Sequence, residues 1–187
     1  IHERLVGSEM CIRDSKVLSK VYGLGSPDGF VFNMSVGYDL DGIKGRKVNT
    51  YINNMMDAGK TAQFKECKKV LNELFPEKKD FIASISPNVS RSVTLSTLHG
   101  CPPQEIERIA SYLLTKKHLH TFVKCNPTIL GYKTARSILD SMGYDYIVFD
   151  EHHFNEDLQW EDAVPMFERL QKLADKEGLE FGLKLSN

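Results

Sequence analysis

The sequence predicts an α/β fold that forms part of a (β/α)8 barrel, and three observations support this prediction. Short apolar runs alternate with amphipathic stretches from about residue 30 onward. The repeat is about 30 residues long, which is typical of strand–helix units with right-handed crossovers and parallel strands. The runs are apolar throughout, as expected for strands that are buried on both faces. An open doubly wound sheet is the alternative, but we find no Gly-x-Gly-x-x-Gly turn of the kind that dinucleotide-binding sheets usually carry.

The strand candidates are short runs rich in β-branched and aromatic residues. They lie at residues 30–36, 93–97, 121–125, 146–149 and 181–185. Only about five strand–helix units are therefore visible, whereas a closed barrel has eight. Because the last run stops close to residue 187, we expect a fragment of a barrel with strands missing at both ends.

Apolar residues at helical spacing predict the helices between these strands. Four of the expected helices lie at residues 47–58, 61–75, 132–142 and 161–176. A further helix opens at Pro102-Pro103, where the missing N–H of proline costs little. Its predicted buried stripe consists of Ile106, Ile109, Ala110, Leu113 and Leu114. Residues 81–92 are interpreted as an insertion with a short strand, and residues 150–153 as a polar loop.

The first 15 residues are interpreted as a leader that is not native to the protein. The run at residues 7–15 has no clear helical or strand period, and it resembles a string that recurs at the start of translated metagenomic reads. We therefore exclude residues 1–15 from fold reasoning. Residues 16–187 are then the barrel fragment.

The composition is that of an ordinary globular protein, since 41% of the 187 residues are hydrophobic and 26% are charged. The net charge of −1 gives no reason to expect a nucleic-acid or anionic-membrane partner. No apolar run is long enough to cross a bilayer, and no signal-peptide pattern opens the chain. The four cysteines lack C-x-x-C spacing, so we expect a reduced, cytoplasmic chain without a zinc or iron–sulfur clip.

In a barrel, functional side chains gather at the carboxyl ends of the strands and in the loops that follow. This rule selects amides, hydroxyls and two lysines, among them Asn33, Thr94, Thr97, Lys124, Asn126 and Lys184. The lysines are the most informative, because an ammonium group beside buried neighbours is costly unless an anion meets it. Each is either a lysine that extends its charge to solvent or a cation that faces negative charge on a ligand, such as a reduced flavin ring.

Cysteine and histidine residues offer weaker candidates. Cys101 precedes a helix N-terminus, which can lower the pKa of a thiol, so it is either a reactive thiol or a small buried residue. Cys67 and Cys125 are interpreted as packing residues. His152 and His153 are adjacent, and neighbouring residues on an extended segment point in opposite directions, so we expect no metal site there.

Several blocks of sequence carry a resemblance to a known family. These blocks are residues 32–38, 53–57, 94–103, 121–128 and 181–187. They closely resemble the family described as the "putative selenate reductase large subunit", which is itself similar to dihydropyrimidine dehydrogenase. The resemblance implies an FMN-type TIM barrel, with FAD, NAD(P)H and 4Fe-4S clusters expected only in parts of the parent protein that this chain lacks.

The resemblance also implies roles for particular residues. In dihydroorotate and dihydropyrimidine dehydrogenase barrels, a strand ends in Leu-Ser-Cys-Pro-His-Gly, whose cysteine is the acid/base. Residues 95–100 fit this frame with Thr97 in place of the cysteine, and Cys101 lies four residues further on. Thr97 and Cys101 are therefore the catalytic candidates. The cofactor-binding candidates are Asn33, Thr94, Lys124, Asn126 and Lys184, with Lys124 and Lys184 as rivals for the lysine that meets the flavin.

Two functional hypotheses follow. In the first, the chain is part of an oxidoreductase subunit that passes electrons through a flavin-type barrel to a small oxidised substrate. In the second, the barrel has lost its flavin and is a structural or docking module in a multi-domain electron-transfer protein. Its partners are then other domains or subunits of that protein. The fragment alone is expected to be inactive, because flavin barrels grip the phosphate with the loops after strands 7 and 8.

Overall fold

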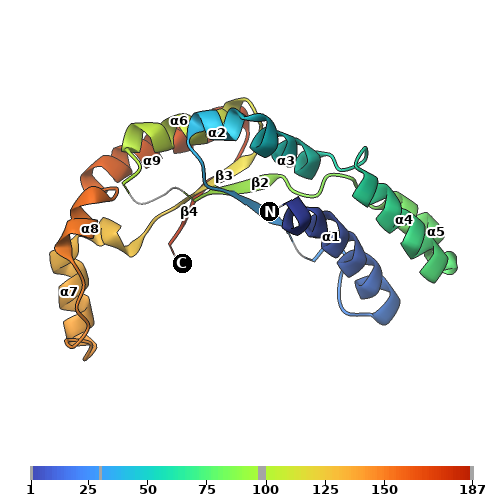
Figure 1. Cartoon of the computed structure of the whole chain (residues 1–187), viewed down its shortest axis with the longest axis horizontal. Coiled ribbons are helices and arrows are strands. Elements are labelled where there is room, and N and C mark those ends of the chain that lie inside the picture. Colours follow the sequence, from blue (N-terminus) through green and yellow to red (C-terminus); the bar gives the residue numbers. More distant parts are fainter. Residues whose placement is uncertain (1, 30, 97–99, 186–187) are drawn as a thin grey trace. The chain divides into compact units, whose positions relative to one another are not determined.

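The computed structural model describes residues 2–29, 31–96 and 100–185, with side chains described from residue 12 onward. The chain forms two compact units (Figure 1). The first unit contains residues 1–34 and 45–91, and the second contains residues 35–44 and 92–187. None of the described helices is both long enough and apolar enough to cross a membrane.

A sheet of short strands organises the second unit. Its strand order is β1 (Asn33–Val36), β2 (Ser92–Leu95), β3 (His120–Lys124) and β4 (Phe181–Lys184). β2 pairs with β3 in parallel, and β3 pairs with β4 in parallel. The predicted α/β class with parallel strands is confirmed. The described residues form four strands, however, where the sequence predicted about five.

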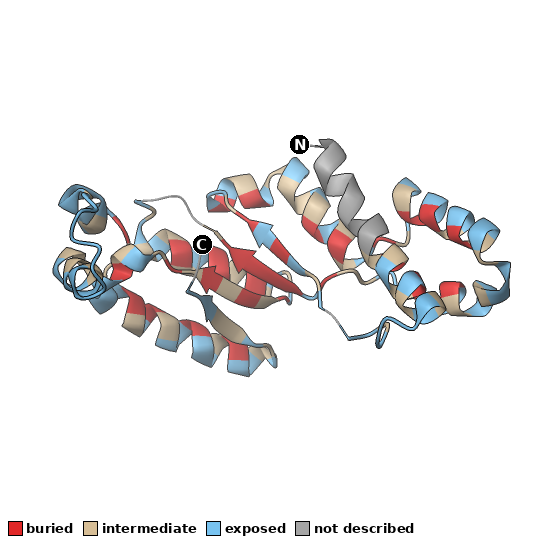
Figure 2. Ribbon diagram, turned by 90° about the horizontal axis from the view of Figure 1, so that it is seen from below, coloured by how far each residue is buried: buried red, intermediate tan, exposed pale blue. Residues whose placement is uncertain are grey.

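Three helices cover one face of this sheet (Figure 1). They are α2 (Leu40–Lys44), α6 (Pro103–Thr115) and α9 (Trp160–Glu177). α6 begins with Pro103 in its first turn, as predicted, and α9 ends at Gly178 in the left-handed conformation. The apolar stripe predicted on α6 is fully confirmed, because the side chains of Ile106, Ile109, Ala110, Leu113 and Leu114 are all buried. Figure 2 shows the middle strands of the sheet coloured largely as buried.

The pairing register assigns side chains to the two faces of the sheet. Val123 pairs with Leu95 and Leu183, and these residues share the face towards the helices, where Phe181 contacts Phe167 of α9. Residues one step along each strand point to the opposite face. That opposite face therefore carries Thr94, Phe122 and Gly182 at one level, and Lys124 and Lys184 at the carboxyl edge.

The exit of β1 approaches the end of β2 closely. The Ser96 N–H donates to the Val36 carbonyl at 2.7 Å, which continues the sheet by one step. A Cβ atom at Gly37 would lie 2.6 Å from the Ser96 carbonyl oxygen, which is closer than real side chains come. Position 37 therefore needs a glycine, because any side chain there would collide with the Ser96 carbonyl.

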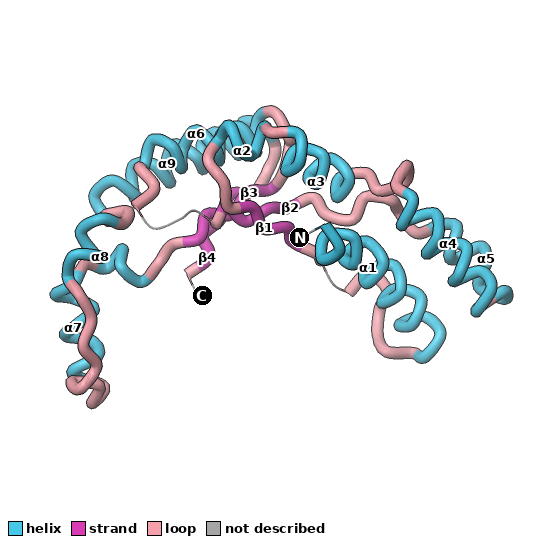
Figure 3. Tube along the Cα trace, viewed as in Figure 1, coloured by secondary structure: helices cyan, strands magenta, loops and turns pink. Residues whose placement is uncertain are grey.

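The predicted strand at residues 146–149 is wrong. Figure 3 draws the segment after α7 (Tyr132–Ser141) as loop, and Tyr146 and Val148 are 73% and 94% exposed. The Arg136 guanidinium binds this segment instead, donating to the carbonyls of Tyr144 and Ile147 and lying over the Phe149 ring. The segment therefore lies outside the sheet, in which β3 pairs directly with β4.

The expected polar loop at residues 150–153 is also wrong, since it begins a short helix, α8 (Glu151–Glu156). Asp150 caps it, accepting a hydrogen bond from the His152 N–H at 2.9 Å. His152 then pairs with Glu156 one turn later, at 3.1 Å. A short 3-10 helix (Pro127–Leu130) joins β3 to α7.

The first unit is helical. The predicted helices at 47–58 and 61–75 are confirmed as α3 (Arg46–Met56) and α4 (Ala62–Leu74). The insertion with a short strand predicted at 81–92 is wrong, because a 3-10 helix (Pro76–Lys78) continues into α5 (Lys79–Ser84), and the next strand begins only at Ser92. The small core of this unit consists of Val17, Cys67, Leu71, Ile82 and Ile85.

The chain before residue 23 forms a helix, α1 (His2–Tyr22). Arg13 is buried, and its guanidinium donates to the carbonyls of Phe64 and Ile82 at 2.8 and 3.2 Å. Sequence reasoning set this segment aside, so the helix was not predicted. The interpretation of residues 1–15 as a non-native leader stays a prediction.

Amide hydrogen exchange distinguishes four strands from five. We expect the amides of Tyr146 and Val148 to exchange within about tenfold of an unstructured peptide, because they lie outside the sheet. The amides of Thr121 and Cys125 are the internal control, since they donate to the carbonyls of Glu180 and Lys184. Equal protection of all four amides would show that the predicted strand forms after all.

Candidate functional site

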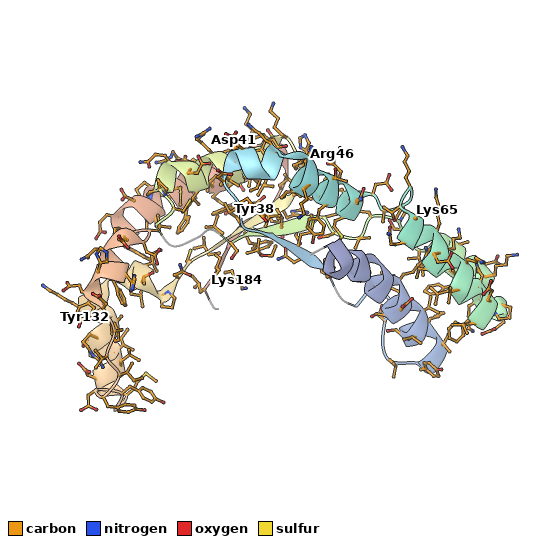
Figure 4. All side chains as sticks on the ribbon, in the orientation of Figure 1. Tyr38, Asp41, Arg46, Lys65, Tyr132 and Lys184 are labelled. Atoms are coloured by element: carbon orange, nitrogen blue, oxygen red, sulfur yellow. The ribbon has the colours of Figure 1, made fainter. Side chains whose placement is uncertain are left out.

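The carboxyl ends of β3 and β4 bring two lysines together. Lys124 ends β3, Lys184 ends β4, and the two are direct partners in the parallel register. Lys184 lies on the side of the sheet away from α2 and α6 (Figure 4). The Cys125 N–H donates to the Lys184 carbonyl at 2.9 Å, which fixes the two strand ends to each other. The rival lysines of the sequence analysis are therefore neighbours on one face.

A small pocket opens beside Lys124, at the edge where functional side chains are expected. The residues that line it come from α6 and the loop before it, from the end of β3 and the segment that follows, and from the turn after α8. They include Cys101, Lys124, Asn126, Thr128 and Asp157. Three residues that the sequence selected, Cys101, Lys124 and Asn126, thus meet at one pocket.

A buried carboxylate joins the segments of this pocket. Asp157 is only 7% exposed, and it accepts hydrogen bonds from the Gly100 N–H at 3.1 Å and from Thr128 Oγ1 at 2.6 Å. Asn126 Nδ2 donates to Asp157 Oδ2 at 3.4 Å, and this is the same oxygen atom that accepts from Thr128. Hydrogen bonds to an ionised acceptor are stronger than neutral ones, so this carboxylate ties the loops firmly.

The sequence left Cys101 as either a reactive thiol or a small buried residue, and its surroundings in the structure favour the second alternative. Burial raises the pKa of the Cys101 thiol, and the nearby carboxylates of Glu105 and Asp39 raise it further. Glu105 lies in the first turn of α6 and Asp39 directly precedes α2, so their negative charge disfavours the thiolate. Cys101 is half-buried, and its surroundings favour the thiol over the thiolate.

The packing roles of the other two described cysteines are confirmed. Cys125 is 4% exposed, and burial raises its pKa to about 11. Cys67 is 3% exposed in the first unit, and burial together with a hydrogen bond to Asp14 raises its pKa to about 12. Neither thiol is suited to nucleophilic chemistry near neutral pH.

The remaining candidates lie apart from this pocket. Thr94 is buried within β2, one register level below the edge, since it pairs with Phe122 rather than with Lys124. Asn33 opens β1, is exposed, and belongs to the first unit. Thr97 lies outside the residues that the structure describes.

Sequence reasoning missed Asp157 and Thr128. Thr128 was within reach, because it directly follows the Asn126-Pro127 loop at a strand end. No sequence pattern marked Asp157 as a candidate, because it follows α8, whose first residues were interpreted as a polar loop. An acidic residue between two helices has no periodicity to mark it, and only the fold shows that it is buried.

The parallel sheet, the helices on one face and the polar carboxyl edge define part of a TIM-barrel-type α/β domain. Comparison with protein families agrees, because residues 11–187 match the family described as "Oxidoreductase YgfK, N-terminal TIM-barrel domain". The match covers nearly the whole chain, and the chain belongs to this family. The fold class predicted from the sequence and its assignment to an oxidoreductase family are both confirmed.

Two curated relatives support the assignment. Each is described as "Putative oxidoreductase YgfK", one from Escherichia coli (strain K12) and one from Escherichia coli O157:H7. This chain is 44% identical to each over 177 residues, which cover 87% of the chain and 17% of the relative. The chain therefore spans about a sixth of the length of these relatives. No solved structure was found to match it.

The raised pKa of Cys101 predicts slow alkylation. A raised folded-state pKa keeps the thiol protonated at pH values where an ordinary cysteine, with a pKa of 9.0, begins to ionise. At pH 8 we therefore expect iodoacetamide to modify Cys101 more slowly in the folded protein than in guanidinium-unfolded protein, with the folded rate rising only above pH 9. Mass spectrometry of the Cys101 peptide gives both rates. Faster modification in the folded state would contradict the assignment.

Proposed function

We propose that this chain is the flavin-type barrel of a larger oxidoreductase, and that it takes part in passing electrons to a small oxidised substrate. The observation that carries this proposal is the pair of lysines in register at the carboxyl edge. Like charges at paired positions on neighbouring strands, about 4.8 Å apart, repel each other. An anionic group bound at this edge would relieve the repulsion, so the edge is suited to a ligand that carries or develops negative charge.

The residues present fit the ring of FMN. The face opposite the helices offers the aromatic side chain of Phe122, the two ammonium groups, and the amide of Asn126 in the adjoining loop. The ammonium groups and the amide supply donors for the carbonyl and nitrogen atoms of an isoalloxazine ring, and Phe122 supplies apolar surface. FMN, when bound, supplies the electron-transfer chemistry.

The protein groups would then orient and tune this cofactor. Lys124 is half-buried and adjoins the pocket, whereas Lys184 is exposed, so a charge interaction at Lys124 is screened less by water. We assign Lys124 to the ring and Lys184 to the approach of the substrate. Thr94, buried one level below, would close the face beneath the ring rather than bind it through an exposed group.

The oxidoreductase family and the length of the relatives support a proposal for the class of substrate and for the partners. A small oxidised anion, of which selenate is one example, would be attracted by the same pair of lysines. FAD, NAD(P)H and iron–sulfur clusters would be held by the parts of the larger protein that lie outside this chain. Those parts are the partners that this barrel serves.

A second candidate function is a barrel without flavin that acts as a docking module. The observation that favours it is the raised pKa of the Cys101 thiol in the described pocket, which makes this thiol a poor nucleophile near neutral pH. Such a module would keep the sheet and the helices but would need no charge at the carboxyl edge. Substituting the lysines would then leave every redox property unchanged.

Lysine variants of the full-length oxidoreductase test the proposal. Lys124→Met removes a positive charge that favours the reduced, more negative flavin. It should therefore lower the midpoint potential by about 30 mV or more, equivalent to ~1.4 kcal/mol for two electrons, or empty the site. We expect a smaller shift for Lys184→Met. The matched control is Lys172→Met, on the exposed surface of α9.

Spectroelectrochemical titration and the flavin-to-protein ratio give these quantities. Flavin content and potential that are the same in wild type, Lys124→Met and Lys172→Met would overturn the role of Lys124. A larger effect for Lys184→Met would move the ring-facing role to that lysine.

A further inference from the structure

We propose that Asp157 is a positioning residue, which holds the loop after β2 and the loop after β3 in the arrangement that the candidate site requires. This inference rests on the proposed function for its consequence in the redox reaction. We call the hydrogen bonds of the Asp157 carboxylate to Gly100, Asn126 and Thr128 the clamp, and all of these residues belong to the second unit. Asp157 belongs to neither loop, since it directly follows α8.

The carboxylate of Asp157 binds both loops at once. Its Oδ1 atom accepts from the Gly100 N–H, in the loop between β2 and α6, at 3.1 Å. Its Oδ2 atom accepts from Thr128 Oγ1 at 2.6 Å and from Asn126 Nδ2 at 3.4 Å, both in the segment after β3. One buried group thus joins two segments that are separated in the sequence by α6 and β3.

The backbone of the first loop makes this contact specific. Gly100 has a φ of +75°, a left-handed conformation that residues with a side chain rarely adopt. This conformation accompanies the hydrogen bond of the Gly100 N–H to Asp157. Because Cys101 is the next residue and lines the pocket, fixing Gly100 also fixes the position of the Cys101 thiol.

Through Asn126, the clamp also reaches the carboxyl edge of the sheet, where Lys124 and Lys184 are paired and which we call the lysine edge. Asn126 follows Lys124 by two residues, and the Cys125 N–H between them donates to the Lys184 carbonyl. A carboxylate that holds Asn126 and Thr128 therefore restricts how the end of β3, and with it Lys124, can move. The residue would act through Lys124 and the first loop, not on the substrate.

The turn after α8 needs no carboxylate for its own structure. The backbone carbonyl of Asp157 accepts from Gln159 Nε2 at 2.6 Å, and the same amide donates to the Phe154 carbonyl at 2.7 Å. These bonds involve the backbone and would survive replacement of the side chain. The hydrogen bonds that the Asp157 carboxylate accepts from Gly100, Asn126 and Thr128, by contrast, come from other segments.

The test compares variants of the full-length protein. Asp157→Asn keeps the size of the side chain, but its amide replaces one acceptor oxygen with a donor, so one loop is released. Thr128→Val removes one donor and leaves the carboxylate in place. Asp157→Glu keeps the charge and is the conservative variant. Glu156→Gln, at the exposed preceding residue, is the matched control.

Hydrogen exchange of the Gly100 amide and alkylation of Cys101 both report on the clamp, and neither measurement requires a bound cofactor. We expect Asp157→Asn to speed exchange of the Gly100 amide at least tenfold and alkylation of Cys101 at least threefold at pH 8. Thr128→Val should show smaller increases, and Asp157→Glu should restore part of the wild-type behaviour. Glu156→Gln should match wild type. Exchange and alkylation within twofold of wild type in both Asp157→Asn and Thr128→Val would overturn the clamp.

The flavin potential separates this proposal from the function on which it rests. In a flavin-containing protein, Asp157→Asn should shift the potential in the same direction as Lys124→Met, and Asp157→Glu should reverse part of that shift. An unchanged potential would overturn the positioning role. If the wild-type protein holds no flavin, the proposed function fails, whereas fast Gly100 exchange in Asp157→Asn would still support the clamp. If Asp157→Asn fails to fold, Thr128→Val carries the same comparison.

Discussion

The parallel pairing of β2, β3 and β4 is the constraint on which the rest of the second unit depends. Parallel strands send all their carboxyl ends to one edge, so the residues that end them become neighbours although they are far apart in sequence. Lys124 and Lys184 are 60 positions apart by number and yet are direct partners in the register. The helices α6 and α9 bury one face of the sheet and leave the other to carry the polar edge. The loops that follow the strands then need only a local clamp, which the Asp157 carboxylate supplies.

Sequence pattern was a good guide where one face of an element is buried against a single neighbour. The stripe on α6 was predicted residue by residue, because a period of 3.6 reports directly which side chains face the sheet. The segment at 146–149 has the composition of a strand but forms none. Its composition is compatible with a strand, but the carbonyls of Tyr144 and Ile147 accept hydrogen bonds from Arg136. Arg136 lies twelve residues before Val148, outside the segment itself. The residues of a short apolar run do not indicate that a hydrogen-bond donor outside the run will bind its backbone.

In the candidate site, too, some features could be predicted from the sequence and others depend on tertiary contacts. Cys101, Lys124 and Asn126 were selected from their positions at strand ends, and the fold brings them to one pocket. The two alternatives for Cys101 could not be separated from the sequence, because the helix N-terminus was visible there while the burial of the thiol and the approach of Glu105 and Asp39, which raise its pKa, were not. Asp157 was missed because its importance lies entirely in tertiary contacts. Strand ends can thus be located from the sequence, but the electrostatic environment at those ends requires the assembled loops.

The central claim is that the lysine edge of this oxidoreductase-family barrel serves a flavin. The most direct test is a cofactor count on the purified wild-type full-length protein. The released flavins are separated by chromatography, so that FMN is distinguished from FAD, and each is divided by the protein concentration. The account predicts close to one FMN per chain, in addition to any FAD. FAD without FMN, in protein that was purified under conditions known to retain bound flavin, would contradict it and favour the docking module.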